Sequence, residues 1–231
     1  MMNGLQRTRG QNSLWAVITM LLLGVAILIG SPLMVAAADA VQIGVVEDSG
    51  KSIVLDYTFD NFTEQKVQIR GQIYKRIKLG QESLMREKIG APELPQVNRS
   101  IIIPNDAMME VKMVNCDYYE IRDIDIAPSR GFILRNVNPK NVPYSFGRQY
   151  QNDAFYPAQP FSMSKPYILR DYRGLVVKVY PFQYNPVQRV LRVYTYMTVE
   201  VVKTRAGEVN VKNRPFRPDD VSQAFQKIYR N

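Results

Sequence analysis

The stretch Leu191-Arg-Val-Tyr-Thr-Tyr-Met-Thr-Val-Glu-Val201 alternates between two kinds of side chain. The odd-numbered positions are mostly apolar and share one face: Leu191, Val193, Met197, Val199 and Val201. The even-numbered positions share the other face and are polar or aromatic: Arg192, Tyr194, Tyr196, Thr198 and Glu200. Side chains of a β-strand point to opposite faces with a period of two, so the pattern predicts a strand that is buried on one face.

A second strand signal lies just upstream, in Leu175-Val-Val-Lys-Val-Tyr-Pro-Phe182. This run is apolar on both faces, which is typical of a strand in the centre of a sheet. Asn185-Pro186, which follows it, is a turn signal. We therefore expect residues 175–182 and 191–201 to pair as a hairpin.

Shorter strand signals are found nearer the N-terminus. Ile53–Phe59 and Val67–Ile73 are rich in β-branched or aromatic residues, and Met109–Met113 alternates between apolar and charged side chains. Prolines and glycines separate such runs at short intervals. Many short strands with turns between them predict an all-β fold, and we expect an antiparallel β-sandwich, jelly-roll-like, over residues 39–203.

The last segment, residues 204–231, has a different character. Thr204–Asn213 is polar and is predicted to be a linker. Beyond it, Asp219 or Asp220 can cap a helix whose apolar stripe has helical spacing: Val221, Ala224, Phe225, Ile228 and Tyr229. We therefore expect a short C-terminal helix, packed either against the sandwich or against another domain.

Residues 1–38 have the pattern of a secretory signal peptide. Arg7 and Arg9 form a basic head, and the run from Leu14 to Ile29 is uncharged. A stretch of small residues follows. A basic head, an apolar body and an Ala-x-Ala exit are typical of a cleaved export signal, although the apolar run also approaches the length of a membrane-spanning anchor.

The small residues predict where this signal is removed. Ala36 and Ala38 suit the positions that a signal peptidase requires, so we expect cleavage after Ala38, with a cut after Ala40 as the alternative. The chain is then exported through the inner membrane to the periplasm, the cell surface or the medium. No stable membrane anchor is expected after cleavage.

The composition excludes most catalytic classes. The chain has no histidine, which excludes Ser-His and Cys-His nucleophile pairs and histidine metal ligands, and its single cysteine, Cys116, excludes multi-thiolate sites and an intrachain disulfide. We expect Cys116 to be a buried small apolar residue. The 30 Lys and Arg outnumber the 21 Asp and Glu but are scattered along the sequence, so no nucleic-acid partner is expected. No metal and no cofactor are expected either.

Carboxylate-only chemistry remains possible on composition alone. Asp123 and Asp125 lie in the strand-like run from Ile121 to Ile126, where both side chains would point to one face. A catalytic pair would need a pocket and a raised pKa. A solvated strand face is the simpler interpretation.

The segment Ala127-Pro-Ser-Arg-Gly-Phe-Ile-Leu-Arg-Asn-Val-Asn-Pro139 is predicted to be a loop that two prolines delimit. It carries Arg130 and Arg135 around a short apolar stretch, Phe132-Ile-Leu134. The planar guanidinium can pair with a carboxylate through two hydrogen bonds, so a protruding arginine suits a carboxylate-lined pocket. An ordinary surface loop is the alternative.

Several short motifs occur in one order over residues 90–203, and together they resemble the gingipain propeptide family. They begin with Gly90-Ala-Pro-Glu-Leu-Pro95 and Ser100-Ile-Ile-Ile-Pro104. The later ones are Ile126-Ala-Pro-Ser-Arg-Gly131, Asn138-Pro139, Val142-Pro-Tyr144, Phe155-Tyr-Pro157, Ile168-Leu-Arg-Asp-Tyr-Arg-Gly174, Gln183-Tyr-Asn-Pro186 and Leu191-Arg-Val-Tyr194. The resemblance is looser before and after this range.

The resemblance implies a secreted prodomain with a β-sandwich fold. Such prodomains keep a gingipain-type cysteine peptidase latent during export and assist its folding, so the expected partner is that catalytic domain, in cis or in trans. In arginine-specific members a loop places an arginine in the primary specificity pocket. The matching position is Arg135, flanked by Leu134 and Asn136, with Arg130 as the alternative.

The resemblance also implies that this chain is not a peptidase by itself, because family members carry the catalytic Cys and His in a following domain. Cys116 matches no catalytic position. A protein of another class remains open as the alternative, namely a stand-alone secreted sandwich for adhesion or scaffolding.

Overall fold

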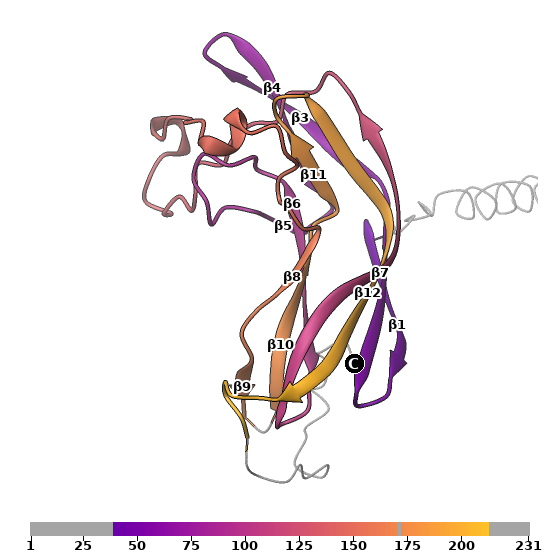
Figure 1. Ribbon diagram of the computed structural model, residues 1–231. Helices are drawn as coiled ribbons and strands as arrows, with labels where there is room; N and C mark the ends of the chain where they lie inside the picture. Colours follow the sequence, from indigo (N-terminus) through magenta and orange to yellow (C-terminus); the bar gives the residue numbers. More distant parts are fainter. Residues whose placement is uncertain (1–38, 171, 213–231) are drawn as a thin grey trace, which may run out of the picture. The chain divides into compact units, whose positions relative to one another are not determined.

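The computed structural model describes residues 39–170 and 172–212 (Figure 1). Ala36, Ala38 and the helix expected near the C-terminus lie outside the described residues. Within them the chain forms strands in antiparallel pairs and two short 3-10 helices, η1 (Pro139–Asn141) and η2 (Arg148–Gln151). None of the described helices is long and apolar enough to cross a membrane. The all-β prediction is confirmed.

The first sheet is built around one long strand, β12 (Val190–Ala206). One edge of β12 pairs with β7 (Ala107–Ile121) along almost its whole length. Its other edge is shared, because β11 (Phe182–Asn185) pairs with its beginning and β2 (Ser52–Phe59) with its middle. β1 (Val41–Asp48) extends the sheet beyond β2.

The second sheet is arranged in the same way around β10 (Tyr172–Val179). One edge of β10 pairs with β6 (Pro95–Ile102), and the other edge of β6 pairs with the short β5 (Ser83–Leu84). The other edge is shared by β8 (Phe161–Met163) and β9 (Tyr167–Leu169). β3 (Phe62–Ile69) and β4 (Gln72–Leu79) form a separate hairpin (Figure 1).

One apolar core joins the two sheets, as expected of a sandwich. The first sheet contributes side chains that water does not reach, among them Leu55, Tyr57, Met197, Val199 and Val201. The second sheet contributes Val97, Ile101, Leu175, Val177 and Val179, which are equally buried. Burying this apolar surface is the main term that favours folding.

The hairpin prediction is correct only in part. β11 and β12 pair across the predicted turn, but Leu175–Val179 belongs to β10 in the other sheet. The chain changes sheets at Tyr180-Pro181: the amide of Tyr180 donates to the carbonyl of Pro160 next to β8, whereas the carbonyl of Pro181 accepts from the amide of Tyr194 in β12. Proline has no amide hydrogen to donate, so Pro181 suits this break between two strands.

The alternation of burial along β12 also departs from the sequence pattern. Tyr194 and Thr198, which were expected on the outer face, are 5% and 9% exposed. The pairing with β7 is irregular at both positions, with register shifts between Tyr194 and Tyr196 and between Thr198 and Val199. The buried hydroxyls are satisfied: Tyr194 donates to Gln183 Oε1 at 2.7 Å and Thr198 to Asp56 Oδ1 at 2.8 Å.

The prediction of one strand over Val67–Ile73 is wrong, because this range contains the tight turn between β3 and β4. Arg70 and Gly71 have positive φ values, 49° and 84°. Two such residues form the turn that matches the twist of paired strands, and glycine adopts this conformation without steric cost. The Arg70-Gly71 pair was therefore the signal that the sequence interpretation missed.

The described C-terminal segment is attached to the sandwich by the buried side chain of Arg173, which is 1% exposed. Its Nη1 donates to the carbonyls of Pro104 and Ala107, both at 2.7 Å. Its Nε and Nη2 donate to Asn210 at 2.8 Å and Val209 at 2.9 Å. The residues that follow β12, within the segment we expected to be a linker, are thus bound to the body of the sandwich.

The sandwich core makes a first prediction. Replacing Leu55, fully buried opposite Val199, by alanine should lower the free energy of unfolding by about 2–5 kcal/mol, because it leaves a cavity between the sheets. Val46→Ala, at a side chain that is 63% exposed, should change it by less than about 0.5 kcal/mol. Urea unfolding, monitored by far-UV circular dichroism, measures the free energy of unfolding of both variants. Equal effects of the two substitutions would contradict the assigned core.

Candidate functional site

The first leg of the predicted loop is paired with the motif Gly90–Pro95. The amide of Ser129 donates to the carbonyl of Ala91 at 2.7 Å, and the amide of Gly90 donates to the carbonyl of Ser129 at 2.8 Å. The amide of Glu93 donates to the carbonyl of Ala127 at 3.0 Å. Residues 127–129 therefore have a fixed backbone position before the loop begins.

Gly90 also contacts the chain that follows the loop. The amide of Gly147 donates to its carbonyl at 2.8 Å. Gly90 has a φ of 81°, and a Cβ atom at this position would lie 2.8 Å from the Gly147 nitrogen. The positive φ and the close approach both require glycine. The motif thus holds the chain on both sides of the loop.

The second leg is held by Arg130, whose side chain folds back across the loop. Its Nη1 donates to the carbonyl of Pro139, and also to the carbonyl of Val142 at 3.3 Å. The guanidinium lies over the ring of Tyr144, with its carbon 4.5 Å from the ring centroid. A cation at this position is attracted to the negative face of the ring. We call this set of contacts, Arg130 with Pro139, Val142 and Tyr144, the arginine clamp.

A buried carboxylate lies behind the clamp. Glu93 is 4% exposed and accepts hydrogen bonds from Arg76 Nε at 2.7 Å and from Arg86 Nε at 3.0 Å. Arg76 also donates from Nη2 to the hydroxyl of Tyr144 at 2.9 Å. Burial opposes the charge of Arg76, but Glu93 and Tyr144 together outweigh it and raise the pKa of this guanidinium. Glu93 therefore fixes Arg76, and Arg76 in turn fixes the ring on which Arg130 lies.

The tip of the loop is a tight turn. The amide of Val137 donates to the carbonyl of Leu134 at 3.0 Å, which places Arg135 and Asn136 at the two central positions. Both central residues are exposed, and the Leu134 side chain beside them is 69% exposed. Arg135 is thus presented to solvent between two anchored legs.

The structure separates the two arginines that the sequence left as alternatives. Arg130 is half-buried and bound to the loop's own backbone, whereas Arg135 is exposed at the turn with Leu134 and Asn136. Sequence reasoning missed the supporting residues Glu93 and Arg76. The signal that could have found them is an acidic residue within the otherwise uncharged motif Gly90–Pro95, because a buried carboxylate requires a basic partner.

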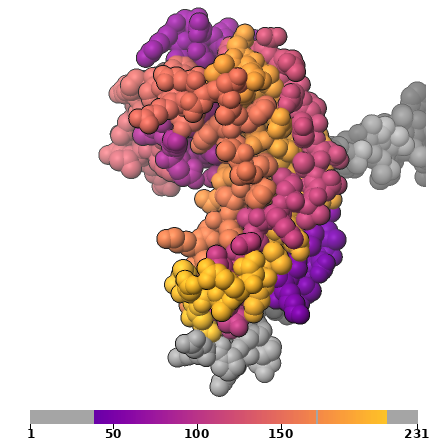
Figure 2. Space-filling view, viewed as in Figure 1, coloured from indigo at the N-terminus to yellow at the C-terminus, as the bar shows by residue number. Residues whose placement is uncertain are grey.

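The segments that form this site lie together in space. Figure 1 shows the chain between β5 and β6 beside the chain that carries η1 and η2, at one side of the sheets. In the space-filling view their atoms form one protruding lobe (Figure 2). The lobe contains little regular secondary structure, so its conformation depends on the polar contacts described above.

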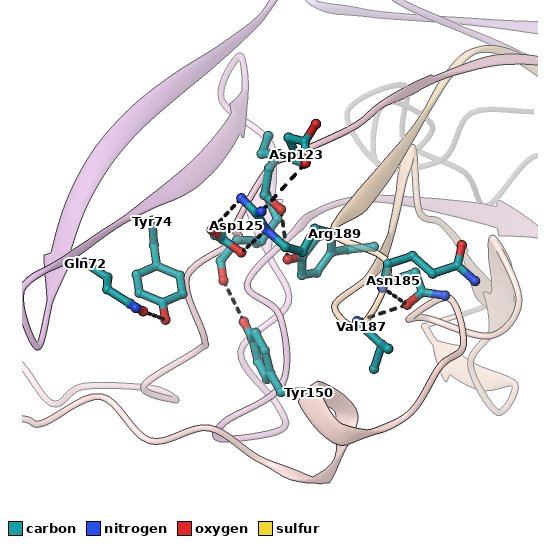
Figure 3. A network of polar contacts seen from close by, with 12 residues as sticks. Gln72, Tyr74, Asp123, Asp125, Tyr150, Asn185, Val187 and Arg189 are labelled. Atoms are coloured by element: carbon teal, nitrogen blue, oxygen red, sulfur yellow. Dashed lines mark hydrogen bonds and ion pairs between the residues drawn. The ribbon is translucent and has the colours of Figure 1, made fainter.

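The two aspartates considered as a catalytic pair are bound by one arginine (Figure 3). Arg189 donates from Nε and Nη2 to the two carboxylate oxygens of Asp125, both at 3.1 Å, and its Nη1 lies 3.7 Å from Asp123. The hydrogen bonds that Arg189 donates to Asp125, together with the charge of Asp125, raise the pKa of Arg189. The expected strand face is wrong, because β7 ends at Ile121 and Asp123 has a φ of 56°.

Cys116 is half-buried rather than buried. It lies on β7 opposite Met197 and is a free thiol that packs against the edge of the core. Over residues 39–170 and 172–212, no group of histidine, cysteine, aspartate or glutamate side chains is arranged to hold a metal ion.

Comparison with known proteins shows the family to which this chain belongs. The family model Propeptide_C25 matches residues 37–226. The chain belongs to this gingipain propeptide family. Gingipain R1 of Porphyromonas gingivalis is 37% identical over 142 residues, and gingipain R2 of the same species is 40% identical over 146 residues. Each alignment covers 62% of this chain but only 14% and 19%, respectively, of the relative.

Solved structures of the family have the same fold. The complex of the Porphyromonas gingivalis RgpB pro- and mature domains contains a chain that superimposes with a TM-score of 0.74 at 31% identity, covering 81% of this propeptide and 96% of that chain. A structure of gingipain K from the same species, described in terms of zymogenic latency, matches with a TM-score of 0.61 at 18% identity. It covers 74% of this propeptide and 96% of that chain, and supports the fold alone.

The buried carboxylate makes a second prediction. Glu93→Gln removes the buried carboxylate that pairs with Arg76 and Arg86, and should lower the free energy of unfolding by about 2–4 kcal/mol, because the half-buried guanidinium of Arg76 loses its charged partner. The matched control is Glu64→Gln, which breaks the partly exposed pair with Lys75 and should cost less than about 1 kcal/mol. Urea unfolding measures both variants, and a Glu93→Gln effect no larger than that of the control would contradict the role of Glu93.

Proposed function

We propose that this propeptide keeps a gingipain-type cysteine peptidase latent by inserting the turn at Arg135 into the active-site cleft. The observation that carries the proposal is an exposed arginine at the tip of a loop whose two legs are both anchored. In the proposed complex, the guanidinium of Arg135 donates paired hydrogen bonds to a carboxylate in the primary specificity pocket. Leu134 and Asn136 contact the walls of the cleft on either side.

The anchored legs favour inhibition on entropic grounds. A flexible loop loses conformational freedom when it binds, and this loss subtracts from the affinity. The pairing of Ser129 with Gly90 and Ala91 and the clamp from Arg130 to Pro139 already restrict the loop before it meets a partner. More of the interaction energy is then available for binding.

The surroundings of Arg135 support a protein partner. Phe132 and Leu134 are 72% and 69% exposed, and Ile89 beside Gly131 is 65% exposed. Exposed apolar side chains that gather around a charged anchor are typical of surfaces that other proteins cover. The catalytic domain of a gingipain-type peptidase, joined in cis or supplied in trans, is the partner we infer, since the similar RgpB chain forms a complex of pro- and mature domains.

We further infer that the propeptide itself is not catalytic and that it assists the folding of its partner. A chain without histidine has no Cys-His pair of its own. The sandwich, which we expected over residues 39–203 and which continues to Ala206 at the end of β12, is the inhibitory part, and the residues that follow lead toward the catalytic domain. Residues 1–38 direct export, and signal peptidase cuts after Ala38, with Ala36 as the second small residue that it recognises.

The inhibitory role makes a third prediction. Purified propeptide should inhibit an arginine-specific gingipain-type catalytic domain, and Arg135→Ala should raise the inhibition constant at least about tenfold, because it removes a charge-assisted hydrogen-bonded pair from the pocket. Hydrolysis of a fluorogenic arginine substrate measures this constant.

The matched control is Arg122→Ala, which removes another exposed arginine near the end of β7, whose side chain is 76% exposed. This variant should inhibit as the unmodified propeptide does. Equal inhibition by Arg135→Ala would contradict the role of Arg135 in the pocket, whereas no inhibition by the unmodified propeptide would contradict the whole proposal.

The export signal makes a fourth prediction. N-terminal sequencing of the exported protein should begin at Asp39, the residue after Ala38. Ala38→Arg should block the cut and leave the precursor uncleaved, because signal peptidase requires a small residue there. Recovery of exported protein that still begins at Met1 would contradict the cleaved signal.

A further inference from the structure

The arginine clamp joins the two sides of the loop around the exposed turn. Arg130 lies at the start of the loop, and the carbonyls that it binds belong to Pro139 and Val142 on the other side. The bond between Arg135 and Asn136 lies between these two ends. Residues 130–139 therefore form a ring that the guanidinium closes without a covalent link.

The turn hydrogen bond spans the same peptide bond at closer range. The carbonyl of Leu134 precedes the Arg135–Asn136 bond, and the amide of Val137, which donates to it at 3.0 Å, follows it. On the first leg, the Ser129 side chain accepts from the Gly131 amide at 3.1 Å. On the second leg, the Asn138 side chain accepts from the Lys140 amide at 2.9 Å. Each leg thus has a local hydrogen bond of its own, in addition to the clamp that joins the two legs.

We propose that Arg130 is a positioning residue that keeps Arg135 and Asn136 together during attack, so that the propeptide acts as an inhibitor rather than a substrate of an arginine-specific cysteine peptidase. The proposal rests on the proposed function, because it requires Arg135 to occupy the specificity pocket. An arginine in that pocket presents the Arg135–Asn136 bond to the nucleophile. Latency then depends on what happens after attack.

The chemistry of a cysteine peptidase explains why the clamp matters. The partner's thiolate attacks the carbonyl carbon of Arg135, the bond to the Asn136 nitrogen breaks, and that nitrogen leaves with a proton as an amine. Water can then hydrolyse the thioester to the Arg135 carboxylate and the free thiol. Alternatively, the Asn136 amine attacks the thioester, re-forms the peptide bond and releases the thiolate.

The position of the amine decides between these two outcomes. An amine held beside the thioester has a high effective concentration and also blocks the approach of water. The contacts of Arg130 with Pro139 and Val142 limit how far Asn136 can move away. Farther along this leg, Tyr144 is held by Arg76 and Gly147 by Gly90, so loss of the clamp would lengthen the unsupported segment.

The test compares the full chain with Arg130→Met, which keeps an unbranched apolar stem but has no donor and no charge. Each is incubated with an arginine-specific gingipain-type catalytic domain, and both enzyme activity and cleavage between Arg135 and Asn136 are followed by fluorogenic assay and mass spectrometry. Arg130→Met should inhibit at first but be cleaved at least about tenfold faster, with recovery of activity, because the released amine escapes. Arg130→Lys, which keeps a charge and a donor, should be cleaved more slowly than Arg130→Met and should therefore inhibit for longer.

A second measurement does not require the variant to fold. The unmodified chain is cleaved between Arg135 and Asn136, repurified and mixed with the peptidase. A measurable fraction of intact chain should re-form. If no intact chain re-forms, the proposal is overturned. Cleavage of Arg130→Met no faster than that of the control Arg122→Met would also overturn it. If Arg135→Ala inhibits as well as the unmodified chain, the proposed function itself fails, so the two failures are distinguishable.

Discussion

The carboxylate of Glu93 is buried between two guanidinium groups, and the conformation of the arginine loop depends on this interaction. A buried charge is tolerated only when it is paired and hydrogen-bonded, so Arg76 and Arg86 are held in place by an energetic requirement. Arg76 positions Tyr144, and the ring of Tyr144 supports Arg130. The effect of one buried acid is thus transmitted to the exposed turn through direct contacts.

The sandwich serves as the rigid base for this chain of contacts. β12 is paired on both edges, with β11 directly before it in the chain and with β2 and β7 from distant parts of the sequence. The lobe, by contrast, has few regular hydrogen-bonded strands, and side-chain contacts replace them. This division suits a protein whose fold has to be stable while a short irregular segment makes the contact with its partner.

Much of the fold could be predicted from local patterns, and the failures have physical reasons. Period-two alternation predicted β12, and uninterrupted apolar character predicted the central position of β10. The change of sheet at Tyr180-Pro181 could not be read locally, because the run stays apolar on both sides of it. The burial of Tyr194 and Thr198 accompanies irregular pairing with β7, which the local alternation of side chains does not show. In the site, the exposed arginine could be predicted, but Glu93, Arg76 and Tyr144 are brought together from three separate segments, which only the tertiary structure shows.

The central claim is that Arg135, on a loop fixed by Glu93 and Arg130, occupies the specificity pocket of a peptidase. A crystal structure of this chain in complex with an arginine-specific gingipain-type catalytic domain tests it most directly. We expect the guanidinium of Arg135 to pair with a carboxylate in that pocket, with the clamp from Arg130 to Pro139 still formed. A complex in which Arg135 lies in solvent, or in which Arg130 has left Pro139 to enter the pocket, would contradict the account.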